Sequence, residues 1–239
     1  MKPLVFLHGW GQSARIWYQQ QQAFPDAHYL HLPGHGGSAD ADDWFASCTQ
    51  ELPQVPCHLI GWSLGGMLAM KLALSHPKRI QSLILVNTTP RFRQSDNWKY
   101  GCDDEIFQAF EQGVEHQAGK TMSRFFAMMF HGEDISRSDY QSIAHQAIDR
   151  HHPPTQEGLQ HGLTLLSEMD LHDNLSNITQ PTLIISGDSD AIISPKSSRT
   201  LAEHIPHATL HRFRASGHAP FLSHSAQFNS LLEQWCQTH

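Results

Sequence analysis

Short runs of consecutive hydrophobic residues alternate along the chain with longer segments in which hydrophobic residues recur every three or four positions. The short runs predict buried strands, and the longer segments predict helices with a buried face. Strands that alternate with helices in this way are typical of a parallel sheet in an α/β fold. The expected strands lie at residues 4–7, 29–32, 57–60, 82–86, 182–187 and 209–213.

The clearest helical spacing follows the third of these strands. Leu64, Leu68 and Leu72 recur every four positions. The pair His76-Pro77 ends this segment, because the residue before a proline disfavours helical backbone angles. Two further helices are expected at about residues 195–204 and 225–236.

The pattern of hydrophobic residues changes in the middle of the chain. From about residue 91 to residue 169 it shows helical patterns without a convincing strand. We therefore predict an α/β core of residues 1–90 and 170–239, with residues 91–169 inserted as a helical cap, or lid.

The charge balance argues against a nucleic-acid-binding protein. The chain has 16 lysines and arginines and 23 aspartates and glutamates, whereas neutralising phosphates requires an excess of basic residues. The first hydrophobic run is too short for a signal peptide, and no later run approaches the length of a membrane span. We expect a cytoplasmic monomer that binds neither nucleic acid nor membrane.

Cysteines and histidines give no clear metal signal. The four cysteines are widely scattered and form no C-x-x-C pair, which fits reduced thiols better than a disulfide framework. His204, His207 and His211 are close in sequence, but the run crosses a proline and matches no fixed metal-binding motif. We expect solvated imidazoles there and no bound metal.

The sequence Gly61-Trp62-Ser63-Leu64-Gly65 matches G-x-S-x-G, a pattern that places a nucleophilic serine on a sharp turn between a strand and a helix. A predicted strand precedes it and a predicted helix follows it. Glycines fit here because a tight turn leaves no room for Cβ atoms near the serine. We predict that Ser63 is a catalytic nucleophile; the alternative is that Ser63 only caps the helix.

A nucleophilic serine needs a base beside it and a group that orients the base. Asp190 follows one predicted strand and His218 follows the next, so both fall in loops at the carboxyl edge of the sheet. The order Ser, Asp, His is the one expected for this architecture. We predict His218 as the base and Asp190 as the acid, with Asp188 as the rival acid.

The developing oxyanion needs backbone N–H donors. We predict that these come from Leu64, directly after the serine, and from Trp10, in the small-residue loop after the first strand. Trp10 and Trp62 are also candidates for walls of an acyl pocket, although a buried tryptophan is commonly only part of the core.

These segments together resemble the α/β-hydrolase superfamily over nearly the whole chain. The resemblance rests on Leu7-His8-Gly9-Trp10-Gly11, Leu32-Pro33-Gly34-His35-Gly36-Gly37-Ser38, the Ser63 segment and Gly217-His218. Common members begin with two more strands than this chain has, so we expect a mostly parallel sheet of about six strands.

Within the superfamily, the chain resembles the methyl ester esterases of biotin synthesis. The likeness rests on residues 61–66, 123–127 and 217–224. It implies hydrolysis of the methyl ester at the far end of a pimeloyl chain bound to acyl-carrier protein, without a cofactor. It also implies contacts from the cap, for which we nominate Phe125 for the substrate and Lys120, Arg124 and Arg137 for the acidic carrier.

Other functions stay open at this point. Another esterase, a lyase or a carbon–carbon hydrolase on the same fold would share Ser63, Asp190 and His218, because fold and triad do not fix the substrate. A non-catalytic binding protein would have little need for all three residues.

Overall fold

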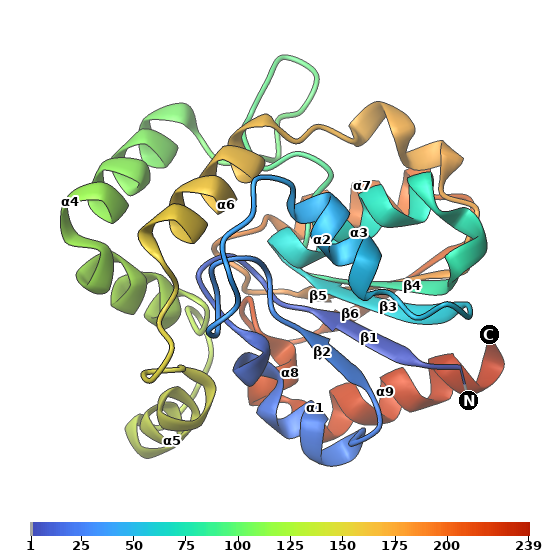
Figure 1. Ribbon diagram of the computed structural model, residues 1–239, viewed down its shortest axis with the longest axis horizontal. Helices are drawn as coiled ribbons and strands as arrows, with labels where there is room; N and C mark the ends of the chain where they lie inside the picture. The colour runs from blue at the N-terminus through green and yellow to red at the C-terminus, as the bar shows by residue number, and fades with distance from the viewer. Residues whose placement is uncertain (1) are drawn as a thin grey trace.

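The computed structural model describes residues 2–239 and contains one six-stranded sheet (Figure 1). All neighbouring strands in it run parallel, in the order β2-β1-β3-β4-β5-β6. The expected mostly parallel sheet of about six strands is confirmed. The strands are β1 (Leu4–Leu7), β2 (His28–Leu30), β3 (Cys57–Trp62), β4 (Ile80–Val86), β5 (Thr182–Gly187) and β6 (Ala208–Phe213).

Two strands end at different residues from those expected. β2 stops at Leu30, and the N–H of Leu32 donates instead to the His8 Nε2 atom at 2.9 Å. β3 continues past Ile60, since Gly61 and Trp62 pair in register with Leu85 and Val86 of β4. These extra pairs bring β3 directly to Ser63.

Helices cover both faces of the sheet, and hydrophobic residues alternate between the two faces. Val5 and Leu7 belong to one buried cluster, whereas Phe6 belongs to the other. The first cluster packs under α2 (Trp44–Glu51), α3 (Leu64–Ser75) and α7 (Pro195–His204), and the second under α1 (Tyr18–Ala23), α8 (Pro220–Ser223) and α9 (Ser225–Thr238).

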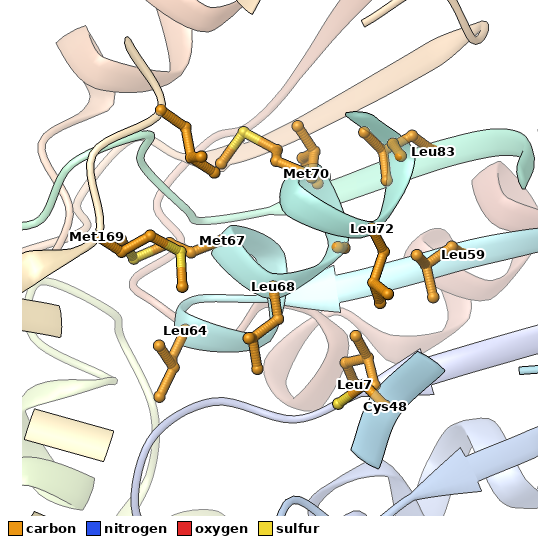
Figure 2. Packing of buried hydrophobic residues seen from close by; sticks show 14 of the residues in the cluster. Leu7, Cys48, Leu59, Leu64, Met67, Leu68, Met70, Leu72, Leu83 and Met169 are labelled. Atoms are coloured by element: carbon orange, nitrogen blue, oxygen red, sulfur yellow. The ribbon is translucent and has the colours of Figure 1, made fainter. Parts of the chain in front are cut away.

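Helix α3 is buried on nearly all sides, because α2 and α6 pack against the face that points away from the sheet. Figure 2 shows Leu68, Leu72 and Met67 of α3 in one cluster with Leu59 of β3 and Met169. This packing fixes the start of α3, and with it the turn that carries Ser63.

The chain between β4 and β5 forms helices and no strand; the structure describes every residue of this stretch. The elements are α4 (Asp104–Met128), α5 (Arg137–Ala147), α6 (Gln156–Glu168) and the 3₁₀ segment His172–Asn177. Gln117 has non-helical angles, with φ −145° and ψ 50°, and divides α4 into two arms. The division of the chain into a core and a cap at residues 91 and 169 stays a prediction.

The carboxyl ends of the strands all meet at one edge of the sheet, since the strands are parallel. In Figure 1 this edge faces α4, α5 and α6, and the second arm of α4 runs back toward it. Any side chain in a loop at this edge therefore lies between the sheet and these helices. Across residues 2–239, none of the helices combines the length and the apolar character that a bilayer crossing needs.

Candidate active site

Ser63 occupies the tight turn between β3 and α3. Its backbone has φ 55° and ψ −121°, a region that residues with a side chain rarely adopt. A Cβ atom on Gly61 would lie 2.4 Å from the Gly65 carbonyl oxygen, and one on Gly65 would lie 2.5 Å from the His8 carbonyl oxygen. Both flanking glycines are therefore required by the close approach of the backbone.

The Ser63 hydroxyl takes no part in holding the turn. The turn is held through the main chain of Ser63: Ser63 N donates to Val86 O at 3.0 Å, and the Thr88 side-chain hydroxyl donates to Ser63 O at 2.6 Å. The Ser63 side chain makes no capping bond to α3. The capping alternative is therefore wrong, and the hydroxyl is left free for chemistry.

Asp190 and His218 form a buried pair at the carboxyl edge of the sheet. His218 Nδ1 and Asp190 Oδ2 are 2.8 Å apart, and the two side chains are 0% and 1% exposed. The other carboxylate oxygen of Asp190 accepts from the backbone N–H groups of Ile192 and Ile193, at 2.8 and 2.9 Å. These bonds hold the carboxylate in place, and an ionised carboxylate fixes the proton of the imidazole on Nδ1.

The rival acid lies elsewhere. Asp188 accepts from Arg212 Nε at 2.8 Å, and its side chain is 26% exposed. Of the two aspartates, the structure therefore brings Asp190 and not Asp188 to His218.

The second ring nitrogen of His218 has no partner. Nε2 is buried and makes no hydrogen bond with any residue from 2 to 239. The indole N–H of Trp62, the residue before Ser63, donates to the His218 carbonyl oxygen at 2.8 Å, and the two rings pack with centroids 5.3 Å apart. The serine turn and the histidine loop are thus directly joined.

The loop after β1 passes beside Ser63. A Cβ atom on Gly9 would lie 3.1 Å from the Ser63 Cβ atom. The backbone N–H groups of Trp10 and Leu64 donate to no acceptor within residues 2–239, which suits donors that await a ligand. Both nominated oxyanion donors therefore remain free on the strand-end side of the turn.

The Trp10 side chain packs into the helices above the site. Its indole donates to the Leu159 carbonyl oxygen of α6 at 3.0 Å, and its ring lies edge-on to Phe125 with centroids 5.4 Å apart. Phe125, on α4, also lines a cavity of about 360 Å³ whose walls are mostly apolar and include Ala191 and Ile192, next to Asp190. Phe125 thus joins the loop after β1 to an apolar cavity beside the candidate acid.

A second cavity lies on the other side of α4. Its volume is about 410 Å³, and Gly11 and Gln12, which follow Trp10, form part of its wall. Met122 and Arg150 also line it. Apolar cavities with a few polar groups are where small ligands and acyl chains commonly bind.

The three nominated basic residues lie on two helices. Lys120 and Arg124 are exposed, one turn apart on the second arm of α4, and Arg137 is the first residue of α5. None of the three forms an ion pair with a carboxylate in residues 2–239. Lys120 and Arg124 therefore share a surface, whereas Arg137 stands on a different helix.

Buried histidines support the loop after β1. Burial lowers the pKa of His8 well below its usual range and that of His35 to about 4. The two rings lie 5.4 Å apart. Both imidazoles are therefore neutral at pH 7 and serve as packing and hydrogen-bonding groups. The histidines near residue 207 lie on α7, the turn after it and β6, and no three potential ligands gather anywhere within residues 2–239.

Two residues that contact the histidine loop were not found from the sequence. Asn87 Nδ2 donates to the Gly217 carbonyl oxygen at 2.9 Å, and Glu133 Oε1 accepts from the Gly217 N–H at 2.5 Å. Asn87 has a positive φ of 41°, as asparagine tolerates, but no sequence motif marks either residue.

Comparisons with known proteins identify the fold family and several relatives. The family model described as alpha/beta hydrolase fold matches residues 2–225. The chain is 34% identical to the pimeloyl-[acyl-carrier protein] methyl ester esterase of Aeromonas hydrophila, over 97% of this chain and 94% of the relative. It is 36% identical to the protein of the same name from Nitrosomonas europaea, over 96% and 94%.

Solved structures show the same fold. An esterase from Exiguobacterium antarcticum superposes with a TM-score of 0.87 and 24% identity, covering 99% of this chain and 92% of that chain. A bromoperoxidase from Bacillus anthracis gives a TM-score of 0.84 and 26% identity, with the same coverage.

Proposed function

This chain belongs to the alpha/beta hydrolase fold family, and because relatives 34% and 36% identical to it are named pimeloyl-[acyl-carrier protein] methyl ester esterases, we propose that it hydrolyses the methyl ester of pimeloyl-acyl-carrier protein to methanol and free pimeloyl-acyl-carrier protein in biotin synthesis. It is a carboxylic ester hydrolase. The observation that carries the catalytic part is the buried Asp190–His218 pair, whose free Nε2 lies in a loop joined to the strained turn of Ser63.

In the proposed mechanism the Ser63 hydroxyl attacks the ester carbonyl while His218 Nε2 accepts its proton. The imidazolium then gives this proton to the departing methoxide, and methanol leaves. Water, deprotonated by the same Nε2, attacks the acyl-enzyme, and the proton returns to Ser63 as the acid is released. No cofactor is needed for any of these steps.

Asp190 has the role of orienting and stabilising the base. Its hydrogen bond to Nδ1 keeps the lone pair of the neutral imidazole on Nε2 and favours the imidazolium that forms during the reaction. The N–H groups of Ile192 and Ile193 hold the carboxylate in this orientation, so that no rearrangement is needed at each turnover.

The N–H groups of Leu64 and Trp10 are proposed to bind the oxyanion of each tetrahedral intermediate. Leu64 N lies at the start of α3, where the helix dipole also favours negative charge. One donor of this kind contributes about 3–4 kcal/mol of transition-state stabilisation in comparable enzymes.

For the substrate we propose that the acyl chain passes along Phe125 in the apolar cavity under α4. Lys120 and Arg124 on the exposed side of α4, with Arg137 on α5, would contact the acidic carrier. Anchoring the carrier at the cap holds the thioester at the rim while the distal ester reaches Ser63, and binding far from the chemistry then decides which carbonyl reacts.

Free methanol is the decisive product. Purified protein is given methyl pimeloyl-carrier protein, and methanol and the carrier species are measured, with Ser63→Ala as control. Methanol in equal amount to free pimeloyl-carrier protein supports the proposal. Hydrolysis of a small chromogenic ester without any release of methanol from the carrier substrate would favour the alternatives, another esterase, a lyase or a carbon–carbon hydrolase.

We further propose that the chain works as a cytoplasmic monomer. The names of its relatives, which describe an ester bound to an acyl-carrier protein, support the compartment. Light scattering after size-exclusion chromatography tests the oligomeric state.

A further inference from the structure

The backbone of Gly217, the residue before His218, is held on both sides. Its N–H donates to Glu133 Oε1 at 2.5 Å, and its carbonyl oxygen accepts from Asn87 Nδ2 at 2.9 Å. Glu133 lies in the turn that follows α4, whereas Asn87 directly follows the central strand β4. The base loop is therefore clamped between the sheet and the end of a cap helix.

The sheet side of this clamp is rigid. Asn87 is 1% exposed, and its Oδ1 atom accepts from Gly187 N at 2.8 Å, so one side chain bridges the end of β5 and the base loop. A Cβ atom on Gly187 would lie 2.0 Å from the Gly217 carbonyl oxygen. The backbones are in direct contact there, and the base loop cannot move toward the sheet.

The cap side is the turn of residues 129–133. Besides the Glu133 contact, the Met129 carbonyl oxygen accepts from His218 N at 2.7 Å, and a Cβ atom on Gly217 would lie 2.3 Å from it. The same turn also reaches the acid loop, since a Cβ atom on Gly132 would lie 2.9 Å from Ser189 Cβ. One short turn thus contacts the loops of both Asp190 and His218.

Glu133 is suited to this role by its charge. An ionised carboxylate accepts shorter and stronger hydrogen bonds from an N–H group than a neutral acceptor does. Ser216 Oγ, one residue further back, donates to the same Oε1 atom at 3.4 Å. Within residues 2–239, Glu133 forms no ion pair that would draw it away from the loop.

We propose that Glu133 is a positioning residue, which holds His218 in its working position through Gly217 and links the end of α4 to the base. The proposal rests on His218 being the general base. Without this contact the cap side of the loop loses its side-chain anchor, and the imidazole moves relative to Ser63. A displacement of about 1 Å at a catalytic group can lower turnover by about 100-fold.

The test compares Glu133→Ala, Glu133→Gln and the neighbouring control Asp134→Ala on a small chromogenic ester, which needs no carrier. Asp134 is exposed and forms no hydrogen bond to the base loop. We expect Glu133→Ala to lower kcat by about 10- to 100-fold with KM within about threefold of wild type. Glu133→Gln, whose amide oxygen still accepts from Gly217 N, should recover most of this loss, and Asp134→Ala should equal wild type.

A second readout follows the base itself. The downfield proton resonance of the His218–Asp190 hydrogen bond should broaden or shift in Glu133→Ala and return in Glu133→Gln. Wild-type kcat in Glu133→Ala would overturn the proposal. So would equal losses in both Glu133 variants together with lower thermal stability, since the residue would then be only structural. Ser63→Ala in the same assay tests the serine mechanism separately from the role of Glu133. Activity retained in Ser63→Ala would contradict the serine mechanism itself.

Discussion

His218 Nδ1 lies 2.8 Å from Asp190 Oδ2, and this pair is closed off from solvent, while Nε2 on the opposite side of the ring has no hydrogen-bond partner among residues 2–239. An imidazole held in this way has one nitrogen committed to a carboxylate and the other available for proton transfer. The hydrogen bond to Asp190 thus sets which ring nitrogen can act as the base, and the predictions on catalysis rest on this assignment.

Replacing Ser63 by alanine removes the nucleophile. Since the hydroxyl holds neither the turn nor α3, the fold should survive and turnover should fall by about 10⁶-fold, the scale known for triad serines. Methanol release and thermal unfolding are measured on the same preparation. Near-normal esterase activity in a well-folded variant would show that another group attacks the ester.

The two aspartates should behave very differently. Asp190→Asn leaves the size of the side chain unchanged but favours the wrong imidazole tautomer, so kcat should fall by about 10⁴-fold. Asp188→Asn removes only a partly exposed pair with Arg212 and should change kcat little. If Asp188→Asn proved the more damaging, the assignment of the acid would be wrong.

Reversal of charge on α4 should affect the carrier substrate more than a small free ester, although Arg124 also borders the cavity that Phe125 lines. Lys120→Glu with Arg124→Glu should raise KM for carrier-bound ester by about 3- to 30-fold, because each exposed ion pair contributes about 1 kcal/mol or less. The salt dependence of KM should weaken as well. Kinetics with a small free ester serve as control, and an equal loss on both substrates would point to a damaged cap.

Acid should destabilise the fold through His35. Burial lowers its folded-state pKa to about 4, so between pH 7 and pH 5 the unfolded chain binds a proton there and the folded chain does not. The free energy of unfolding should therefore fall by about 2 kcal/mol at this position as the pH falls from 7 to 5.

Urea unfolding of wild type and His35→Asn at both pH values measures this effect. The variant should be less stable at pH 7 but should lose less stability on acidification. His145→Asn, which changes an exposed histidine, is the control and should keep the wild-type pH dependence. Identical pH dependence in His35→Asn and wild type would contradict the prediction.

Much of the scaffold could be predicted because its signals are local. The hydrophobic runs at β1 and β5 and the helix Pro195–His204 have the bounds that their sequence pattern predicts. The turn at Ser63 was equally visible, since both glycines that its backbone requires lie within two residues of it.

Contacts between segments that are distant in sequence have no local sequence pattern that would predict them. Asn87 and Gly217 are 130 positions apart, and Glu133 and Gly217 are 84 apart. In both contacts Gly217 contributes a backbone group: the carbonyl oxygen is present in every residue and the N–H in every residue except proline. The sequence around Gly217 therefore does not mark it as their common target. For a related reason, β2 ends before the position that its hydrophobic run predicts, because the N–H of Leu32 donates to the His8 side chain and not to a neighbouring strand.

The backbone of Ser63 has one more consequence. A serine at φ 55° carries conformational strain of about 1–3 kcal/mol, which glycine would not carry, and the nearby contacts keep it in place. The folded state is thus less stable than the same scaffold with glycine at position 63, which would have no hydroxyl. At this one position the requirements of stability and of the proposed reaction oppose each other, because the residue that supplies the hydroxyl also carries the strain.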